Sequence, residues 1–288
     1  MTTSGSTSVE EPNTGSEALQ RFALGVEYDG SAYNGWQMQP HAPSIQESLS
    51  KAISFVANEP VKAFGAGRTD TGVHATMQVA HFESHANREE KNWLFGINTN
   101  LPDDIVVKWI RPVSSEFSAR FSARSRSYRY LLLNHPERPS KNSALDRLRA
   151  WSVQQPLDVG AMHRAAQLLE GKHDFDAFRA SSCQSPTSIR TMHKLSVVRD
   201  GAAILFDICG DAFLHHMVRN ITGTLVKVGS GEASEEWVAE LLASRDRKLS
   251  GMTAPPHGLY FTDVVYPDEF GLPRGGYPVF PLSGRSTL

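Results

Sequence analysis

Segments in which apolar residues occupy every second position recur along the chain, and they constrain its fold more than any other feature. They lie at residues 22–28, 105–109 and 128–132. A period of two puts one set of side chains on one side of a pleated strand, so each segment predicts a strand with one buried face. Residues 197–198 and 204–206 flank an Asp-Gly turn, which predicts a hairpin. We therefore expect the chain to build a β-sheet.

Amphipathic helices are predicted between the strands. Residues 44–57 begin with a capping box formed by Ser44 and Glu47, and they carry a single apolar stripe. Because hairpins are mixed with helices, and strand and helix do not alternate strictly, the fold class is α+β with a largely antiparallel sheet. Further helices are predicted over residues 157–171, 212–229 and 235–244, and further strands over 61–64, 73–82 and 258–266.

The length of 288 residues suffices for one large domain or two ordinary ones. Residues 1–20 are rich in Ser, Thr, Gly and Glu with almost no large apolar side chain, which predicts a disordered tail. A domain change near Phe117 divides the remainder into an N-terminal unit over 21–117 and a C-terminal unit over 118–288.

The composition limits the class of protein. With 40% hydrophobic and 21% charged residues it is that of an ordinary globular protein. The sequence contains no run of about 18 apolar residues, so no membrane span is predicted. The first twenty residues lack the basic start and apolar centre of a signal peptide. Two cysteines, Cys183 and Cys209, are too few for a disulfide framework or a zinc cluster. These features predict a cytoplasmic protein with two free thiols.

A glycine-rich loop joins two of the predicted strands. Gly65, Gly67 and Gly72 bracket a sequence Arg-Thr-Asp that ends at Asp70. Glycine allows a tight backbone, so the loop can bring the carboxylate close to a ligand, with Arg68 as one candidate to keep it ionised. The same pattern fits a turn whose Asp binds only its own backbone, and spacing alone favours that turn. No Gly-Lys-Ser/Thr follows, so this is not a phosphate-binding loop.

Arginines and aromatic residues are interleaved between residues 117 and 130. A net charge of -2 does not indicate a nucleic-acid-binding protein, but phosphate is recognised by local patches and not by total charge. Aromatic rings can in turn stack on unstacked bases. The alternative is a strand with its tyrosines in the core, which we favour for Tyr130. Together with Arg111, which lies just before this stretch, its arginines form a cluster of Arg111, Arg120, Arg124, Arg126 and Arg129.

Arg219 follows two histidines in the helix predicted over 212–229. His215 and Arg219 are four residues apart and would share a face of that helix. A metal site at His215 and His216 is disfavoured because a third ligand with suitable spacing is missing. No G-x-S-x-G motif and no G-x-G-x-x-G motif after a strand occur, so neither a serine hydrolase of that type nor a dinucleotide enzyme is predicted. The residues alone indicate an RNA-binding α+β protein with a poised aspartate.

Five blocks of sequence, taken together and in this order, carry a resemblance to a known family. They are GRTDTGVHA at 67–75, FSARFSARSRSYRY at 117–130, HDFDAFRASSCQS at 173–185, FLHHMVRNITGTLVKVG at 213–229 and PPHGLYFTDVVYP at 255–267. They resemble the tRNA pseudouridine synthase A (TruA) family, and the similarity runs from about residue 22 to 267. Thr71 is one departure, since the family usually has Ala there.

The resemblance implies roles for five residues. The family's catalytic aspartate matches Asp70, and the buried arginine that pairs with it matches Arg219. Its active-site tyrosine matches Tyr128, and an apolar residue of its substrate site matches Leu259. Arg68 matches the arginine thought to help move the target base.

The resemblance also implies a fold, a reaction and a partner. The family fold has two α/β domains with a central, mostly antiparallel sheet and a basic active-site cleft between them. Its members are homodimers that convert uridine to pseudouridine at tRNA positions 38, 39 and 40 in the anticodon stem-loop. The reaction gains and loses no atoms, so no metal and no cofactor are expected.

Two other functions stay open on the sequence. One is a non-catalytic RNA-binding or RNA-folding protein on the same scaffold, although pure binding has no need of the Asp70 carboxylate. The other is a metal-dependent hydrolase that uses some of the eleven histidines.

Overall fold

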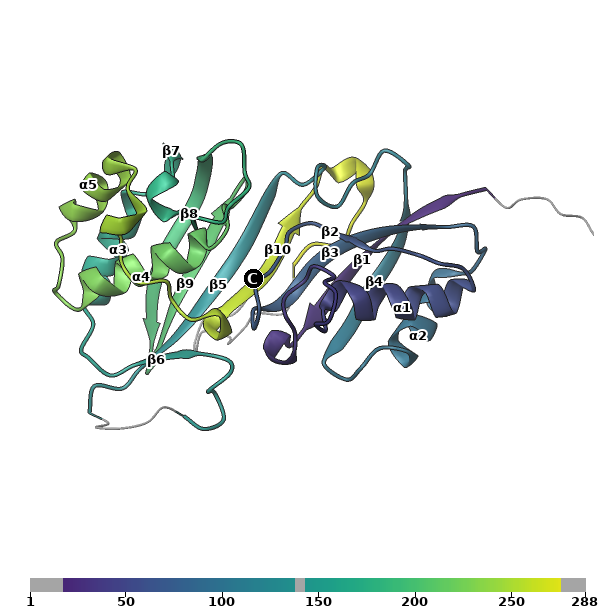
Figure 1. Cartoon of the computed structure of the whole chain (residues 1–288), viewed down its shortest axis with the longest axis horizontal. Coiled ribbons are helices and arrows are strands. Elements are labelled where there is room, and N and C mark those ends of the chain that lie inside the picture. The colour runs from purple at the N-terminus through teal and green to yellow at the C-terminus, as the bar shows by residue number, and fades with distance from the viewer. Residues whose placement is uncertain (1–17, 138–142, 276–288) are drawn as a thin grey trace, which may run out of the picture.

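The computed structural model of the chain describes residues 18–137 and 143–275, and its strands join in one ten-stranded sheet (Figure 1). The strands are β1 (Gln20–Tyr28), β2 (Phe64–Gly65), β3 (His74–Ser84), β4 (Ile105–Val113), β5 (Ser125–Asn134), β6 (Trp151–Val153), β7 (Gly171–Asp174), β8 (Ile189–Asp200), β9 (Ala203–Gly210) and β10 (Leu259–Val265). The helices are α1 (Ile45–Ala57), α2 (Glu90–Thr99), α3 (Val159–Gln167), α4 (Met217–Gly229) and α5 (Glu236–Ser244).

The sheet has the order β4-β1-β3-β10-β5-β9-β8-β7, with β2 beside β3 and β6 beside β5. Its strand pairs are antiparallel except for β10 with β3 and β6 with β5. The predicted α+β class with a largely antiparallel sheet is therefore confirmed. The predicted hairpin is also present, as β8 and β9 around Gly201, which has a positive φ of 58°.

The last strand of the chain lies in the middle of the sheet. In β10, Leu259 is opposite Tyr130 of the antiparallel neighbour β5. On the other side, Tyr260 and Phe261 run parallel to the beginning of β3, beside His74 and Ala75. The chain segment that precedes β10 thus meets the loop that precedes β3. The predicted domain change near Phe117 falls between β4 and β5 and stays a prediction, while the sheet continues across β10 (Figure 1).

Helix α1 begins as its sequence predicts. The Ser44 side chain caps it by accepting a hydrogen bond of 3.3 Å from the backbone N–H of Glu47. Helix α2 was not expected from the sequence, because an internal glycine and three asparagines around residues 92–100 weaken its local preference. Two buried side chains four residues apart, Trp93 and Ile97, anchor it against the sheet instead.

Helix α4 begins five residues later than predicted. The predicted start at residue 212 is wrong, because His216 adopts a left-handed conformation with φ of 61° and the helix starts only at Met217. His215 therefore does not share a helical face with Arg219. Within the described residues, no helix is long and apolar enough to cross a membrane.

Two smaller sequence predictions concern the N-terminal tail and the two cysteines. The predicted tail lies outside the described residues up to residue 17, and β1 begins at Gln20. Cys183 and Cys209 are free thiols, as predicted.

A strap over residues 251–254 packs closely against helix α4. A Cβ atom on Gly223 would overlap the Met252 carbonyl oxygen, so the strap can approach the helix only because residue 223 is glycine. The backbone N–H of Gly251 also donates a hydrogen bond of 3.3 Å to the Thr224 hydroxyl. This close approach fixes the segment that leads into β10.

Gly223→Ala should lower the stability of the protein, although alanine normally stabilises a helix by roughly 0.5–1 kcal/mol over glycine. Overlap with the strap should instead cost about 1–3 kcal/mol. Gly160→Ala in α3 is the matched control, since its Cβ would meet only the flexible end of Arg164 and the Asp158 carboxylate, both at 3.2 Å. Urea unfolding of the two variants measures the difference, and a Gly223→Ala variant as stable as the wild type would contradict the close contact.

Candidate active site

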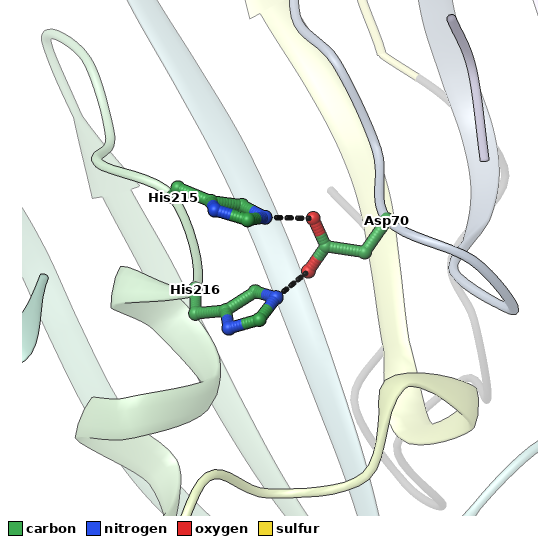
Figure 2. A group of neighbouring side chains, drawn as sticks. All are labelled: Asp70, His215 and His216. Carbon is green, nitrogen blue, oxygen red and sulfur yellow. Dashed lines mark ion pairs between the residues drawn. The ribbon is translucent and has the colours of Figure 1, made fainter. Parts of the chain in front are cut away.

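Asp70 lies in the loop between β2 and β3, and the backbone of this loop is fixed by neighbouring groups. The buried hydroxyl of Thr69 forms a hydrogen bond of 2.9 Å with the Tyr28 hydroxyl. The Thr69 carbonyl accepts a hydrogen bond of 3.0 Å from the backbone N–H of Trp36. The Asp70 carbonyl accepts one of 3.1 Å from the N–H of Val73, which closes a turn. The side chain of Asp70 points away from this turn, toward the segment before α4 (Figure 2).

The start of the same loop is held by a buried arginine. Arg126 donates from Nε and Nη2 to the Ala66 carbonyl at 3.2 Å, and from Nη1 to the Asp211 carbonyl at 2.7 Å. The Gln78 side chain donates to the Gly67 carbonyl at 2.8 Å. Arg126, which the sequence groups with candidate phosphate-binding arginines, thus fixes the backbone of the Asp70 loop.

Asp70 forms an ion pair with Arg219, which the first turn of α4 supplies. The Arg219 Nη1 donates a hydrogen bond of 2.9 Å to Asp70 Oδ2 across a separation of 149 residues in the sequence. Arg219 is itself oriented by the strap, because its Nε donates to the Ala254 carbonyl at 2.8 Å. The two side chains are 23% and 12% exposed, so the pair is largely withdrawn from water. A nearby cation favours the ionised form of such a carboxylate.

Two histidines complete the surroundings of the carboxylate (Figure 2). His215 Nε2 lies 3.3 Å from Asp70 Oδ1, and His216 Nε2 lies 3.4 Å from Asp70 Oδ2. The left-handed backbone of His216 turns the chain directly before α4, so that both rings reach the same carboxylate. Burial lowers the pKa of His216 below its usual range, against the opposite effect of Asp70. Each carboxylate oxygen therefore faces an imidazole nitrogen, and Oδ2 also binds Arg219.

Nothing in the sequence indicates that these histidines meet Asp70. The sequence predicted both histidines within a helix and no third metal ligand near them. The second prediction is wrong, because Asp70 lies beside both rings. The ligand atoms of Asp70, His215 and His216 lie within 4.8 Å of one another. However, Arg219 already places a fixed positive charge on Oδ2, where a second cation would be repelled. The arrangement is therefore best suited to holding an anionic carboxylate.

Tyr128 lies on β5 close to the same loop. Its ring stacks on Phe261 at a centroid distance of 4.7 Å and meets the ring of Phe213 edge-on at 5.0 Å. Burial, with a smaller effect of the Asp70 carboxylate, raises the pKa of Tyr128 well above its usual range. A Cβ on Gly67 would lie 3.6 Å from the Tyr128 hydroxyl, so that hydroxyl faces the Asp70 loop. Tyr128 thus presents a neutral hydroxyl to the site.

The last two predicted site residues differ in their exposure. Leu259 is buried at the first position of β10, directly after the segment whose Pro255 carbonyl accepts a hydrogen bond of 2.7 Å from Tyr130. The fully buried ring of Tyr130 agrees with its predicted place in the core.

Arg68 is exposed and, among the residues described, forms no hydrogen bond or ion pair. The ionic partner of Asp70 is thus Arg219 and not Arg68.

Comparison with known proteins gives a consistent result. A family model described as tRNA pseudouridine synthase matches residues 25–122 and 165–267. A tRNA pseudouridine synthase A of Salmonella typhimurium is 51% identical over 267 residues, which are 93% of this chain and 97% of the relative. A tRNA pseudouridine synthase A of Citrobacter koseri is 50% identical over 95% of this chain and 97% of the relative. A tRNA pseudouridine synthase A of Hydrogenovibrio crunogenus is 51% identical over 88% of this chain and 95% of the relative.

The ion pair should be visible as an energetic coupling between Asp70 and Arg219. Arg219→Gln leaves the carboxylate without its main partner, and Asp70→Asn leaves the guanidinium without one, so each change should destabilise the protein. The double variant should be more stable than the sum of the two effects predicts, by about 1–2 kcal/mol. Urea unfolding of the four proteins measures this coupling.

The more exposed pair Arg164–Glu235 is a matched control, and its coupling should be weaker because water screens it. Additive effects of the Asp70 and Arg219 changes, within about 0.5 kcal/mol, would contradict a strong pair.

Proposed function

The chain belongs to the tRNA pseudouridine synthase family, and we propose that it isomerises uridine to pseudouridine in tRNA with Asp70 as its reacting group. The observation that carries the assignment of the site is the half-buried Asp70 carboxylate, which Arg219 pairs and two histidines flank. Arrangements that surround one carboxylate with cationic and hydrogen-bonding groups are typical of catalytic sites.

The reaction sets the demands on this site. The bond between uracil N1 and ribose C1′ breaks, the base turns, and C5 joins C1′. Because no atom is gained or lost, redox chemistry and nucleotide hydrolysis are not needed, and we propose that the enzyme uses no metal and no cofactor. An ionised carboxylate can start the reaction either by attack on C1′ or by removal of a ribose proton.

The two oxygens of Asp70 are not equivalent. Oδ2 binds Arg219 at 2.9 Å and faces His216, whereas Oδ1 faces only His215 among the described residues. His215 has the most exposed side chain of these three neighbours. The open side of the carboxylate is therefore at Oδ1, and we assign this oxygen to the reaction with the ribose.

Three further residues are proposed to handle the target nucleotide. A uridine in a stem-loop must leave its stack to reach Asp70, at a cost of a few kcal/mol. Tyr128 would contact the extruded uracil with its neutral hydroxyl, and the buried Leu259 would keep water out. Arg68 has no partner among the described residues, so its side chain is available to enter the space that the base leaves.

The RNA surface is proposed to lie beside the Asp70 loop. Of the arginine cluster, Arg111 pairs with Glu90, Arg129 with Asp207, and Arg126 is buried. Arg120 and Arg124 are exposed, and Arg120 lies over the ring of Phe121, which is 79% exposed. Because Arg126 binds the carbonyls of both Ala66 and Arg120, this pair of arginine and aromatic ring is tied to the Asp70 loop.

The family resemblance extends the proposal to the target and to the setting of the reaction. We propose that the target uridines are those at tRNA positions 38, 39 and 40, that the enzyme acts as a homodimer, and that it works in the cytoplasm.

The purified protein should release tritium from a tRNA transcript labelled at uridine C5, because C5 loses its hydrogen when it joins C1′. Transcripts in which cytidine replaces the uridines at positions 38, 39 and 40 are the matched control and should release none. Release that does not depend on these positions would contradict the proposed target. A folded protein that binds tRNA without releasing tritium from a mixed tRNA pool would point to a binding protein instead.

A further inference from the structure

We propose that His215 is a second catalytic residue, which gives a proton to the departing uracil and later takes the proton from C5. This inference rests on the proposed function of the Asp70 site. It assigns a proton donor and acceptor to a reaction for which Asp70 alone does not account, since one proton must leave C5 and one must arrive at N1.

The position of His215 follows from that of Asp70. Whichever step Asp70 performs, Oδ1 must come within contact distance of ribose C1′ or of the hydrogen on its neighbour C2′. The uracil leaves from C1′ itself. His215 Nε2 lies 3.3 Å from Oδ1, so the departing ring comes within a few ångströms of the imidazole. This is the reach that proton transfer by a side chain requires.

The orientation of the ring is fixed from its other side. The Ser182 hydroxyl forms a hydrogen bond of 3.1 Å with His215 Nδ1, which directs Nε2 toward the carboxylate. The His215 side chain is 41% exposed, against 30% for His216 and 12% for Arg219. Of the groups around Asp70, His215 is therefore the one that an incoming nucleotide meets first.

The neighbouring groups are less suited to this role. His216 faces Oδ2, which Arg219 already binds at 2.9 Å, and its left-handed backbone fixes it beside the carboxylate. We regard His216 as a positioning residue. Tyr128 is buried and its raised pKa keeps the phenol protonated at neutral pH, so it is a poor acceptor for a proton from C5. An imidazole gives and takes a proton near neutral pH.

The proton balance is closed. As the N1–C1′ bond breaks, its electron pair stays on N1, and protonated His215 gives its Nε2 proton to N1. After the base has turned, C5 bonds to C1′, and neutral His215 accepts the proton that C5 loses. His215 ends as it began, and pseudouridine carries hydrogen on N1 and none on C5. The count is the same whether Asp70 attacks C1′ or removes and returns a proton of the ribose.

The experiment is a single-turnover measurement of pseudouridine formation on tRNA carrying either hydrogen or deuterium at uridine C5. In His215→Gln the rate should fall by about a hundredfold or more, which is typical for loss of a general acid–base group. Loss of the C5 proton should then limit the rate. The ratio of the rates with hydrogen and with deuterium at C5 should therefore be distinctly larger for the variant than for the wild type. His215→Asn, which is smaller and also cannot titrate, should behave in the same way.

Two histidine variants serve as comparisons. His193→Gln, at an exposed position of β8, should react at the wild-type rate. His216→Gln should slow the reaction without adding sensitivity to deuterium, because it disturbs the position of Asp70 and not the proton transfer. Thermal unfolding and tRNA binding are measured for all variants.

Three outcomes separate the possibilities. A wild-type rate in His215→Gln overturns the proposal. A slow variant that folds, binds tRNA and shows no added sensitivity to deuterium also overturns it, since His215 would then only position Asp70. A wild type that forms no pseudouridine at all contradicts the proposed function itself, which is a different failure.

Discussion

A carboxylate withdrawn from water must be paired, and the pairing of Asp70 with Arg219 is the interaction on which this site depends. An unpaired charge in such a place is costly, and the cost is avoided only if the partner is held in good geometry. Arg219 is held by the first turn of α4 and by the Ala254 carbonyl of the strap before β10. The ion pair therefore needs three segments that lie far apart in the sequence.

The topology of the sheet brings these segments together. Because β10 is inserted between β3 and β5, the residues between the strap and β10 lie against the loop that precedes β3, where a Cβ on Gly72 would lie 3.4 Å from the Pro256 ring. Tyr128 reaches the same place from β5, the other neighbour of β10. The central strand thus joins two halves of the chain at the place where Asp70, Arg219 and Tyr128 come together. A change that displaces the strap, such as crowding at Gly223, should also be felt at Arg219.

Local signals in the sequence predicted much of the fold. The alternation at residues 22–28, the capping box at Ser44 and the Asp-Gly turn each act over a few residues, and each produces the predicted element. Helix α2 was not predicted, because tertiary burial of Trp93, and not local preference, stabilises it. The early start predicted for α4 failed because a left-handed residue, His216, interrupts a pattern that is helical in period. No local signal indicates such a conformation at a histidine.

The site was predictable only in part, because its contacts depend on tertiary structure and not on local sequence signals. The glycine-rich loop marked Asp70 as a candidate, but its alternative as a simple turn could not be set aside by spacing. The family resemblance pointed to Asp70, Arg219, Tyr128, Leu259 and Arg68. The contacts of His215 and His216 with Asp70 are instead set by the fold. Likewise, Arg126 belongs to a cluster of arginines that could bind phosphate. Its side chain binds backbone carbonyls instead, because the pairing of β5 turns it inward.

The most direct test of the account is the release of tritium from C5-labelled uridine in tRNA by the wild type and by Asp70→Asn. The asparagine keeps the size of the side chain and removes its charge and its ability to react with the ribose. The account predicts release by the wild type, none by a folded variant, and tRNA binding that is largely unchanged. Release at a similar rate by the Asp70→Asn variant would contradict the central claim that this carboxylate carries the reaction.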